Sequence, residues 1–131
     1  MVLFCHTKKA WNANRKAQQK LMGSNEESYQ LLPSLAYVLK EKHLGSVINL
    51  GIDANDHFES FFMSLDVWIQ GWNHCFPVLI IDGSFMKAYY KGTLLTACAQ
   101  YANKQIFPLA FGVCDSERKT TWTWFFKKLK E

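Results

Sequence analysis

The sequence lacks long hydrophobic runs, a secretory leader and any cysteine framework. Its longest apolar stretches, 76–81 and 106–114, fall far short of the roughly 20 residues that cross a bilayer. Polar His6 comes too early for the apolar core of a signal peptide. The four cysteines show no CxxC spacing, so neither disulfide bonds nor a structural zinc site is indicated. We therefore predict a chain without a membrane span or a secretion signal.

Internal repeats and low-complexity segments are also missing, and the composition is typical of a folded domain. Of the 131 residues, 49% are hydrophobic and 15% are aromatic, which argues against intrinsic disorder. This length suffices for one domain with a core and is too short for two domains of ordinary size.

The net charge of +4 is spread unevenly along the chain. Five basic residues and no acid lie between Lys8 and Lys20, and from Arg118 onward five bases face only Glu131. The intervening segment carries ten acids and five bases. Basic ends around an acidic middle fit phosphate contacts near a metal centre. The alternative, which charge alone favours, is that the bases form the solvated faces of two amphipathic helices.

Residues 1–45 are predicted to form a helical N-terminal segment. Residues 8–22 suit one weakly amphipathic helix, which the following glycine ends. Ser24 or Asn25 can cap a second helix that has acids in its first turn. Pro33 either kinks this helix or lies in the first turn of a further helix that reaches His43.

Residues 46–76 are predicted to connect this segment to the next one. Residues 46–51 and 57–63 alternate enough to form a hairpin around turn-forming residues at 53–56. A short helix is expected over 65–72.

Residues 77–131 are predicted to hold three strands and then a helix, which is the start of an antiparallel sheet in an α/β fold. The apolar run 78–81 is typical of a buried central strand. Strands are also expected over 93–100 and 105–113, where Pro108 indicates an edge strand or a bulge.

The C-terminal helix, over 118–130, is predicted to lie on this sheet. Trp122, Phe125, Phe126 and Leu129 recur at helical spacing, so we expect core residues here rather than groups that stack on nucleic-acid bases. Trp124 falls on another face of the helix and is the aromatic residue most open to a base-stacking role.

Asp82 is the residue that most directly indicates chemistry. Its carboxylate follows the apolar strand, where it could reach a divalent metal, and Gly83 next to it lets backbone and substrate approach. Two-metal phosphoryl transfer needs several such oxygens around ions roughly 3.5–4 Å apart. Taken alone, Asp-Gly after an apolar run is more often a turn that ends a strand.

A wider set of spaced motifs changes that balance. The motifs are PVLIIDGSFMK at 77–87, YKGTLL at 90–95, QIFPLAFGV at 105–113, DSE at 115–117 and WTWFF at 122–126. Together they closely resemble the core of plant Mutator-like (MULE) transposases of the MuDR type and of their domesticated relatives, the far-red-impaired-response regulators. The sequence upstream resembles the region that precedes this core, so the resemblance covers nearly the whole chain.

The resemblance implies an RNase H-like fold in which three acids hold Mg²⁺ or Mn²⁺ for cutting and joining DNA strands. Asp82 matches the first acid. The other two belong to a later strand and a later helix, at positions beyond Glu131. We therefore predict a partial RNase H-like sheet that holds no metal stably and is inactive alone. Asp115 and Glu117 are not expected to replace these acids, because Asp115 lies two strands from Asp82 and should cap the following helix.

Four bases are candidate DNA contacts: Lys87 and Lys91, close after Asp82, and Arg15 and Lys16 in the first helix. For the first pair, solvated loop lysines are an equally good interpretation. The resemblance implies a nuclear protein with DNA as its partner. An unpaired edge on the strand that bears Asp82 would favour a homodimer or a partner chain there. The alternative function is a non-catalytic, domesticated module that binds DNA or protein.

Overall fold

The computed structural model describes residues 8–86 and 92–130. The chain divides into two compact units, Met1–Leu32 and Pro33–Glu131. The first unit contains α1 (Lys8–Met22) and α2 (Asn25–Gln30). Within the described ranges, no helix is both long enough and apolar enough to cross a membrane.

Local signals in the sequence explain how α1 ends and α2 begins. Gly23, with a φ of +81°, ends α1 in the left-handed region that glycine adopts without strain. The Ser24 hydroxyl accepts the Glu27 N–H at 3.1 Å, and the Glu27 carboxylate accepts the Ser24 N–H at 2.8 Å. These reciprocal bonds form a capping box. The predicted bounds of α1 and the predicted N-cap at Ser24 are confirmed.

The next helix, α3 (Leu32–Lys42), carries Pro33 in its first turn. Because first-turn N–H groups have no partner within a helix, proline removes no hydrogen bond there. The first-turn alternative for Pro33 is therefore confirmed. Gly45, with a φ of +90°, lies in the turn that leads to the sheet.

The predicted hairpin is confirmed as β1 (Val47–Ile52) and β2 (Phe58–Ser64), which pair antiparallel. In the turn between them, Asp53 Oδ1 accepts the N–H groups of Asn55 at 2.8 Å and His57 at 2.9 Å. These hydrogen bonds, with that from His57 the larger influence, lower the pKa of the Asp53 carboxyl. A side chain thus replaces the missing backbone partners of the turn.

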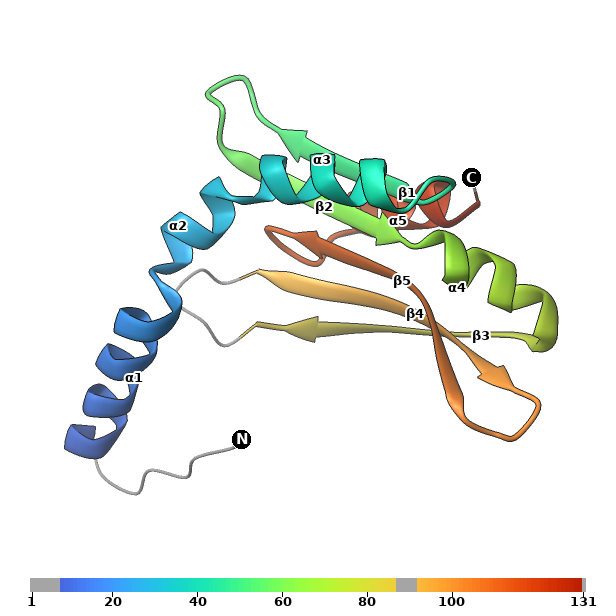
Figure 1. Cartoon of the computed structure of the whole chain (residues 1–131), viewed down its shortest axis with the longest axis horizontal. Helices are drawn as coiled ribbons and strands as arrows, with labels where there is room; N and C mark the ends of the chain where they lie inside the picture. The colour runs from blue at the N-terminus through green and yellow to red at the C-terminus, as the bar shows by residue number, and fades with distance from the viewer. Residues whose placement is uncertain (1–7, 87–91, 131) are drawn as a thin grey trace. The chain divides into compact units, whose positions relative to one another are not determined.

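The five strands of the described residues form one antiparallel sheet in the order β1-β2-β5-β4-β3 (Figure 1). The remaining strands are β3 (Cys75–Phe85), β4 (Thr93–Tyr101) and β5 (Ile106–Cys114), and α4 (Asp66–Gly71) with the 3₁₀ turn η1 (Trp72–His74) leads into β3. The mixed α/β class with a helical N-terminal segment is confirmed. The predicted sheet of three strands is too small, because β2 pairs with β5 and thereby adds the β1–β2 hairpin to the sheet.

Proline in a central strand is accommodated by a bulge. β5 lies between β2 and β4, but β2 pairs with it only at residues 111–114, so Pro108 stands in a part of β5 that pairs with β4 alone among the described strands. The register of β4 against β5 shifts between Ala97 and Cys98, which leaves Leu109 outside the pairing. The Ser64 hydroxyl donates to the Leu109 carbonyl at 2.7 Å. A bulge places the proline, which has no N–H, where the ladder is already interrupted.

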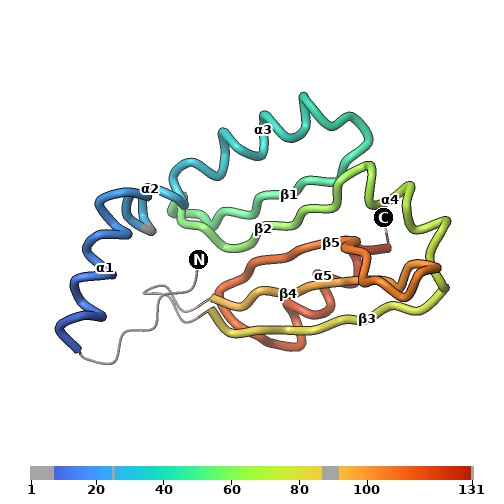
Figure 2. Tube along the Cα trace, turned by 60° about the horizontal axis from the view of Figure 1, so that its bottom comes forward, coloured from blue at the N-terminus to red at the C-terminus, as the bar shows by residue number. Residues whose placement is uncertain are grey.

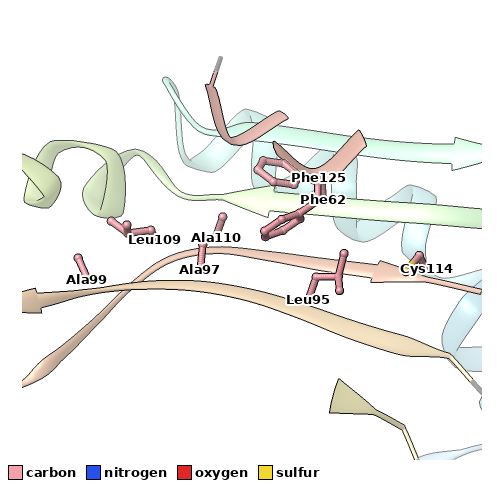
Figure 3. Close-up of a cluster of buried hydrophobic side chains, with 8 residues drawn as sticks. All are labelled: Phe62, Leu95, Ala97, Ala99, Leu109, Ala110, Cys114 and Phe125. Carbon is pink, nitrogen blue, oxygen red and sulfur yellow. The ribbon is translucent and has the colours of Figure 1, made fainter. Parts of the chain in front are cut away.

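The main core lies between the sheet and α5 (Lys119–Lys130) (Figure 3). Phe125 is fully buried there, with its ring centroid 5.6 Å from that of Phe62 in an edge arrangement. Gly112 allows this approach, since a Cβ added to it would lie 2.8 Å from Phe125 Cδ2. Two aromatic assignments are corrected: Trp124 packs edge-on against Phe62 at 6.2 Å, whereas Phe126 is 47% exposed.

The opposite face of the sheet is covered over only part of its width. Ala36 of α3, Ile48 of β1 and Phe61 of β2 are buried, and α3 runs along this hairpin (Figure 2). Farther across, Trp68 of α4 packs edge-on against Phe111 of β5 at 5.5 Å. Helices therefore cover the β1, β2 and β5 side of this face.

β3 does not meet the prediction of a buried central strand. It is the last strand of the sheet, and most of its side chains are exposed. An apolar run indicates that a strand is suited to burial, but the neighbouring strands decide whether it is buried. In the described part of the chain, no strand lies on the far side of β3.

Candidate functional site

Asp82 lies within β3 and not at its tip. It stands opposite Thr96 of β4, and the strand continues to Phe85. The Thr96 hydroxyl donates a long hydrogen bond of 3.5 Å to the Asp82 backbone carbonyl. The interpretation of Asp82-Gly83 as a turn that ends the strand is therefore wrong, because both residues continue the ladder.

The two faces of β3 have different surroundings. Gly83 faces α5, since a Cβ added to it would lie 3.1 Å from the Trp122 ring and 3.4 Å from a Glu117 carboxylate oxygen. Side chains alternate along a strand, so Asp82 projects from the opposite face together with Ile80 and Ser84. All three of these side chains are exposed. The Asp82 carboxylate thus stands on an open surface of the sheet.

A thiol shares this face of the sheet. Cys98 of β4 pairs with Ile80 of β3. On this face of the sheet, that pair is next to the pair of Asp82 and Thr96. Burial raises the pKa of the Cys98 thiol. A metal ion would have to displace the proton of this thiol in order to bind it.

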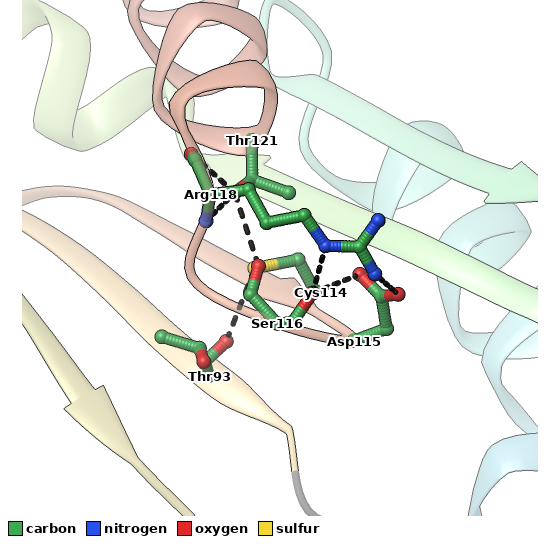
Figure 4. Close-up of polar contacts among 6 residues, drawn as sticks. All are labelled: Thr93, Cys114, Asp115, Ser116, Arg118 and Thr121. Carbon is green, nitrogen blue, oxygen red and sulfur yellow. Dashed lines mark hydrogen bonds and ion pairs between the residues drawn. The ribbon is translucent and has the colours of Figure 1, made fainter.

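The two acids after β5 are held in contacts of their own (Figure 4). Asp115 forms an exposed ion pair of 2.7 Å with the Arg118 guanidinium, whose Nε also donates to the Ser116 hydroxyl at 2.6 Å. Asp115 does not cap α5 as expected. The Arg118 N–H, just before the helix, donates to the Thr121 hydroxyl at 2.7 Å instead. Glu117 accepts the indole N–H of Trp122 at 3.0 Å on the α5 face.

Strand register places Asp115 far from Asp82. Asp82 pairs with Thr96 of β4, and Thr96 pairs with Phe111 of β5. Asp82 is therefore level with Phe111, which is four residues before Asp115. At about 3.3 Å per residue and about 4.8 Å per strand, the two Cα atoms lie roughly 16 Å apart. Glu117 is close to Gly83 in space, but it lies across the sheet from the Asp82 carboxylate. Neither acid can share a metal ion with Asp82.

In residues 8–86 and 92–130, no cluster of three or more His, Cys, Asp or Glu side chains could hold a metal ion. Mg²⁺ requires six oxygen ligands in near-octahedral geometry and commonly takes one or two carboxylates, with water and phosphate oxygens as the rest. The arrangement around Asp82 can supply one of those carboxylates.

The predicted DNA contacts divide between described and undescribed residues. Lys87 and Lys91 lie outside the described residues. Arg15 and Lys16 are on α1, where every side chain is at least partly exposed, and the Arg15 guanidinium carbon lies 5.3 Å from the Trp11 ring centroid. The N-terminal unit that holds α1 and the unit that holds Asp82 are separate compact units.

Two features of the site were missed in whole or in part by sequence reasoning. One is the contact of Glu117 with Trp122 beside Gly83, for which the i, i+5 spacing gives no local signal. The other is the exposure of apolar side chains on both faces of β3, since the sequence analysis anticipated an unpaired edge on this strand but not open faces.

Comparison with known proteins gives a family match for part of the chain. A family model for the MULE transposase domain matches residues 78–131, which include β3 from Val78 onward, β4, β5 and α5. No curated protein and no solved structure matches the chain. The matched segment, which contains Asp82, is similar to a transposase domain.

Proposed function

We propose that this chain carries the first part of the catalytic domain of a Mutator-like DNA transposase, in which Asp82 is one of the metal-binding carboxylates. The observation that carries the proposal is the family match over residues 78–131. This segment contains Asp82, whose side chain is exposed on the surface of β3. The metal ion would be Mg²⁺ or Mn²⁺, as the resemblance to plant MuDR-type elements implies. A protein acting on chromosomal DNA would work in the nucleus, which we propose as its compartment.

We also propose that these 131 residues do not cut DNA by themselves. Phosphoryl transfer depends on metal ions and positioned charge on both the attacking and the leaving oxygen. Asp82 is one exposed carboxylate, and the acids nearest in sequence to α5 are tied to Arg118 and Trp122. A single exposed carboxylate competes poorly with water for Mg²⁺, so it should bind the ion weakly.

The first experiment is Mn²⁺ titration of the isotopically labelled chain, followed by NMR. Paramagnetic Mn²⁺ bound at Asp82 should broaden the amide signals of Gly83 and Thr96 first. The variant Asp82→Asn should lose this broadening, while the control Asp66→Asn should keep it. Uniform broadening in all three proteins would count against Asp82 as a metal ligand.

Cleavage of labelled DNA with Mg²⁺ or Mn²⁺ is the companion assay. We expect no cleavage above background by the wild-type chain or by Asp82→Asn. Cleavage by the wild type that Asp82→Asn abolishes would show an active enzyme and would overturn the claim of inactivity. Cleavage that Asp82→Asn retains would indicate a contaminating nuclease.

A second candidate function is a non-catalytic module that binds DNA through α1. Five bases and no acid lie on this helix, and Arg15 is held over Trp11. Each phosphate contact adds about 0.9 to the slope of log K against log salt. Arg15→Ala/Lys16→Ala should therefore lower the slope by about 1.8, whereas Lys40→Ala/Lys42→Ala, with the same charge change on α3, should lower it less.

Fluorescence anisotropy with a labelled duplex at several salt concentrations would measure these slopes. Binding that is unaffected by EDTA would support the non-catalytic module, because phosphate contacts by lysine and arginine need no metal. Equal slopes for both double variants would exclude Arg15 and Lys16 as specific contacts. Absence of salt-dependent binding would eliminate this candidate function.

A further inference from the structure

The cations of α1 lie on one side of the helix. Successive residues of an α-helix turn by about 100°, so the position of a residue in the sequence fixes the face on which its side chain lies. Counted from Lys8, the cations of α1 fall within an arc of about 140°, which forms the cationic face of the helix. In order around the helix they are Arg15, Lys8, Lys16, Lys9 and Lys20. The remaining arc of about 220° contains no charged residue of α1.

Two amide side chains occupy the middle of this cationic face. Gln19 lies about 20° and Asn12 about 40° from Lys8, whereas the next cation in that direction is at about 80°. These two amides and the five cations are the only residues of α1 within the arc. Both amide side chains are exposed. The helix thus presents two uncharged hydrogen-bonding groups between two rows of cations.

This distribution of charge does not favour the helix itself. Lys8 and Lys9 stand in the first turn, where the helix dipole disfavours cations, and no acid lies in that turn. Lys16 and Lys20 are four residues apart and repel each other. A polyanion bound along the cationic face would remove both penalties. Lysine and arginine also stay at the surface of a folded protein, whatever packs against the opposite side of the helix.

A contact within α1 holds one flank of the cationic face in place. The Arg15 guanidinium carbon lies 5.3 Å from the Trp11 ring centroid, in a cation–π contact. Trp11 is exposed, and helical spacing places it beside Arg15, just outside the face. A guanidinium held in this way loses less rotamer freedom when it binds a phosphate.

We propose that α1 lies in the major groove of double-stranded DNA, where Asn12 and Gln19 read base edges. The two rows of cations contact phosphates on the two sides of the groove, which is about 12 Å wide and admits an α-helix. The 15 residues of α1 extend about 22 Å along it. Asparagine and glutamine each form two hydrogen bonds with adenine, at N6 and N7. The two amides are about 10 Å apart along the helix axis, so they contact different base pairs.

This proposal rests on the second candidate function, DNA binding through α1, and adds a sequence preference to it. Phosphate contacts alone carry no base preference. Double-stranded RNA fits poorly, because side chains cannot read its deep, narrow major groove. A membrane surface also fits poorly, because an interfacial helix buries its apolar face among the lipids. In α1 that face is interrupted by two amides, Asn14 and Gln18, next to Leu21.

Selection of duplexes with a randomised central segment tests the proposal on the full chain. The duplexes that the wild-type chain retains should share a site that contains adenine. The chain should bind this site at least about fivefold more tightly than a scrambled duplex, which is the least that one bidentate contact gives. Fluorescence anisotropy at several salt concentrations measures both affinities. An RNA duplex of the selected sequence should bind more weakly, and equal binding would overturn the proposal.

A pair of matched variants separates base contacts from phosphate contacts. Asn12→Ala/Gln19→Ala should bind the selected and scrambled duplexes equally and keep the salt dependence of the wild-type chain, because amides neutralise no phosphate. The control Asn14→Ala/Gln18→Ala removes the same two residue types from outside the cationic face and should keep the preference. Alanine favours a helix more than asparagine or glutamine does, so neither variant unfolds α1.

The outcomes also separate this proposal from the function on which it rests. Salt-dependent binding without preference for any duplex would leave DNA binding through α1 in place and overturn the base contacts. A preference that Asn12→Ala/Gln19→Ala keeps, or that the control loses equally, would overturn them too. Absence of DNA binding would overturn both. Arg15→Ala/Lys16→Ala should weaken binding to the selected and scrambled duplexes alike, because phosphates occur in every sequence.

Discussion

Truncation of Phe125 is the sharpest test of how α5 is held on the sheet. Phe125 is the buried residue of α5, and its ring meets Phe62 at 5.6 Å. Gly112 lies directly beneath it, so the ring already rests on strand backbone. When Phe125→Ala removes the ring, β5 cannot move up to fill the cavity without breaking its pairing with β2 and β4. The cavity should therefore persist.

The magnitude follows from this geometry. Truncation of a buried phenylalanine in a site that cannot collapse lowers the free energy of unfolding by about 3–5 kcal/mol. The edge contact with Phe62 accounts for about 0.5–1.5 kcal/mol of it. With a urea m-value of about 1–3 kcal/mol/M, a loss of about 4 kcal/mol lowers the unfolding midpoint by roughly 2 M.

The neighbouring residue supplies the control. Phe126 is 47% exposed and stacks on Trp122 at a centroid distance of 5.8 Å. Since half of its ring is already in water, Phe126→Ala should lower the free energy of unfolding by about 1 kcal/mol. The assay is urea unfolding followed by tryptophan fluorescence at one fixed protein concentration, because association shifts apparent stability. Equal losses for the two variants, or a larger loss for Phe126→Ala, would refute this account of the core.

Three further predictions concern single residues. Ser24→Ala removes one half of the capping box with Glu27 and should destabilise α2 by about 1 kcal/mol, visible as faster amide exchange in that helix; unchanged exchange would contradict the role of the cap. Gly45→Ala forces a side chain into a left-handed conformation and places Cβ 2.6 Å from Asp66 Oδ1, so it should lower the free energy of unfolding by more than about 1 kcal/mol, measured with urea. Burial, and then the charge of Asp115, raise the pKa of the Cys114 thiol. The unfolded chain therefore loses this proton at a lower pH than the folded chain does. The contribution of the Cys114 thiol to the free energy of unfolding is complete below the ordinary thiol pKa of 9.0, and it is lost as the pH rises from there to the pKa of the folded state. Cys114→Ala should flatten this alkaline fall in urea stability, and an equally steep fall in the variant would contradict the assignment.

Local chemistry allowed much of the secondary structure to be predicted. The bounds of α1, the cap at Ser24 and the first-turn place of Pro33 depend on residues within one helical turn of each other. The β1–β2 hairpin was predictable for the same reason, because Asp53 bonds to backbone only two and four residues away. Such signals are complete in the sequence because both partners of each hydrogen bond lie in the same short segment.

The surroundings of the candidate site could not be predicted in this way. The pattern assigned Trp124 to an outer face and Phe126 to the core, but the orientation of α5 over Phe62 and Gly112 reversed their exposure. Helical spacing gives the faces of a helix, but the rotation of the helix on the sheet depends on which strand residues leave room for a ring.

Asp82 shows where the two sources of information separate. The sequence by itself placed this carboxylate at the end of an apolar strand, next to a glycine and within motifs that resemble a transposase core. Only the tertiary structure decided that β3 continues through Asp82, that Asp82 projects away from α5, and that Asp115 and Glu117 are occupied elsewhere. The physical reason is that strand order and facing are set by pairing between segments distant in the chain, and a strand's own residues do not encode which neighbour it will have.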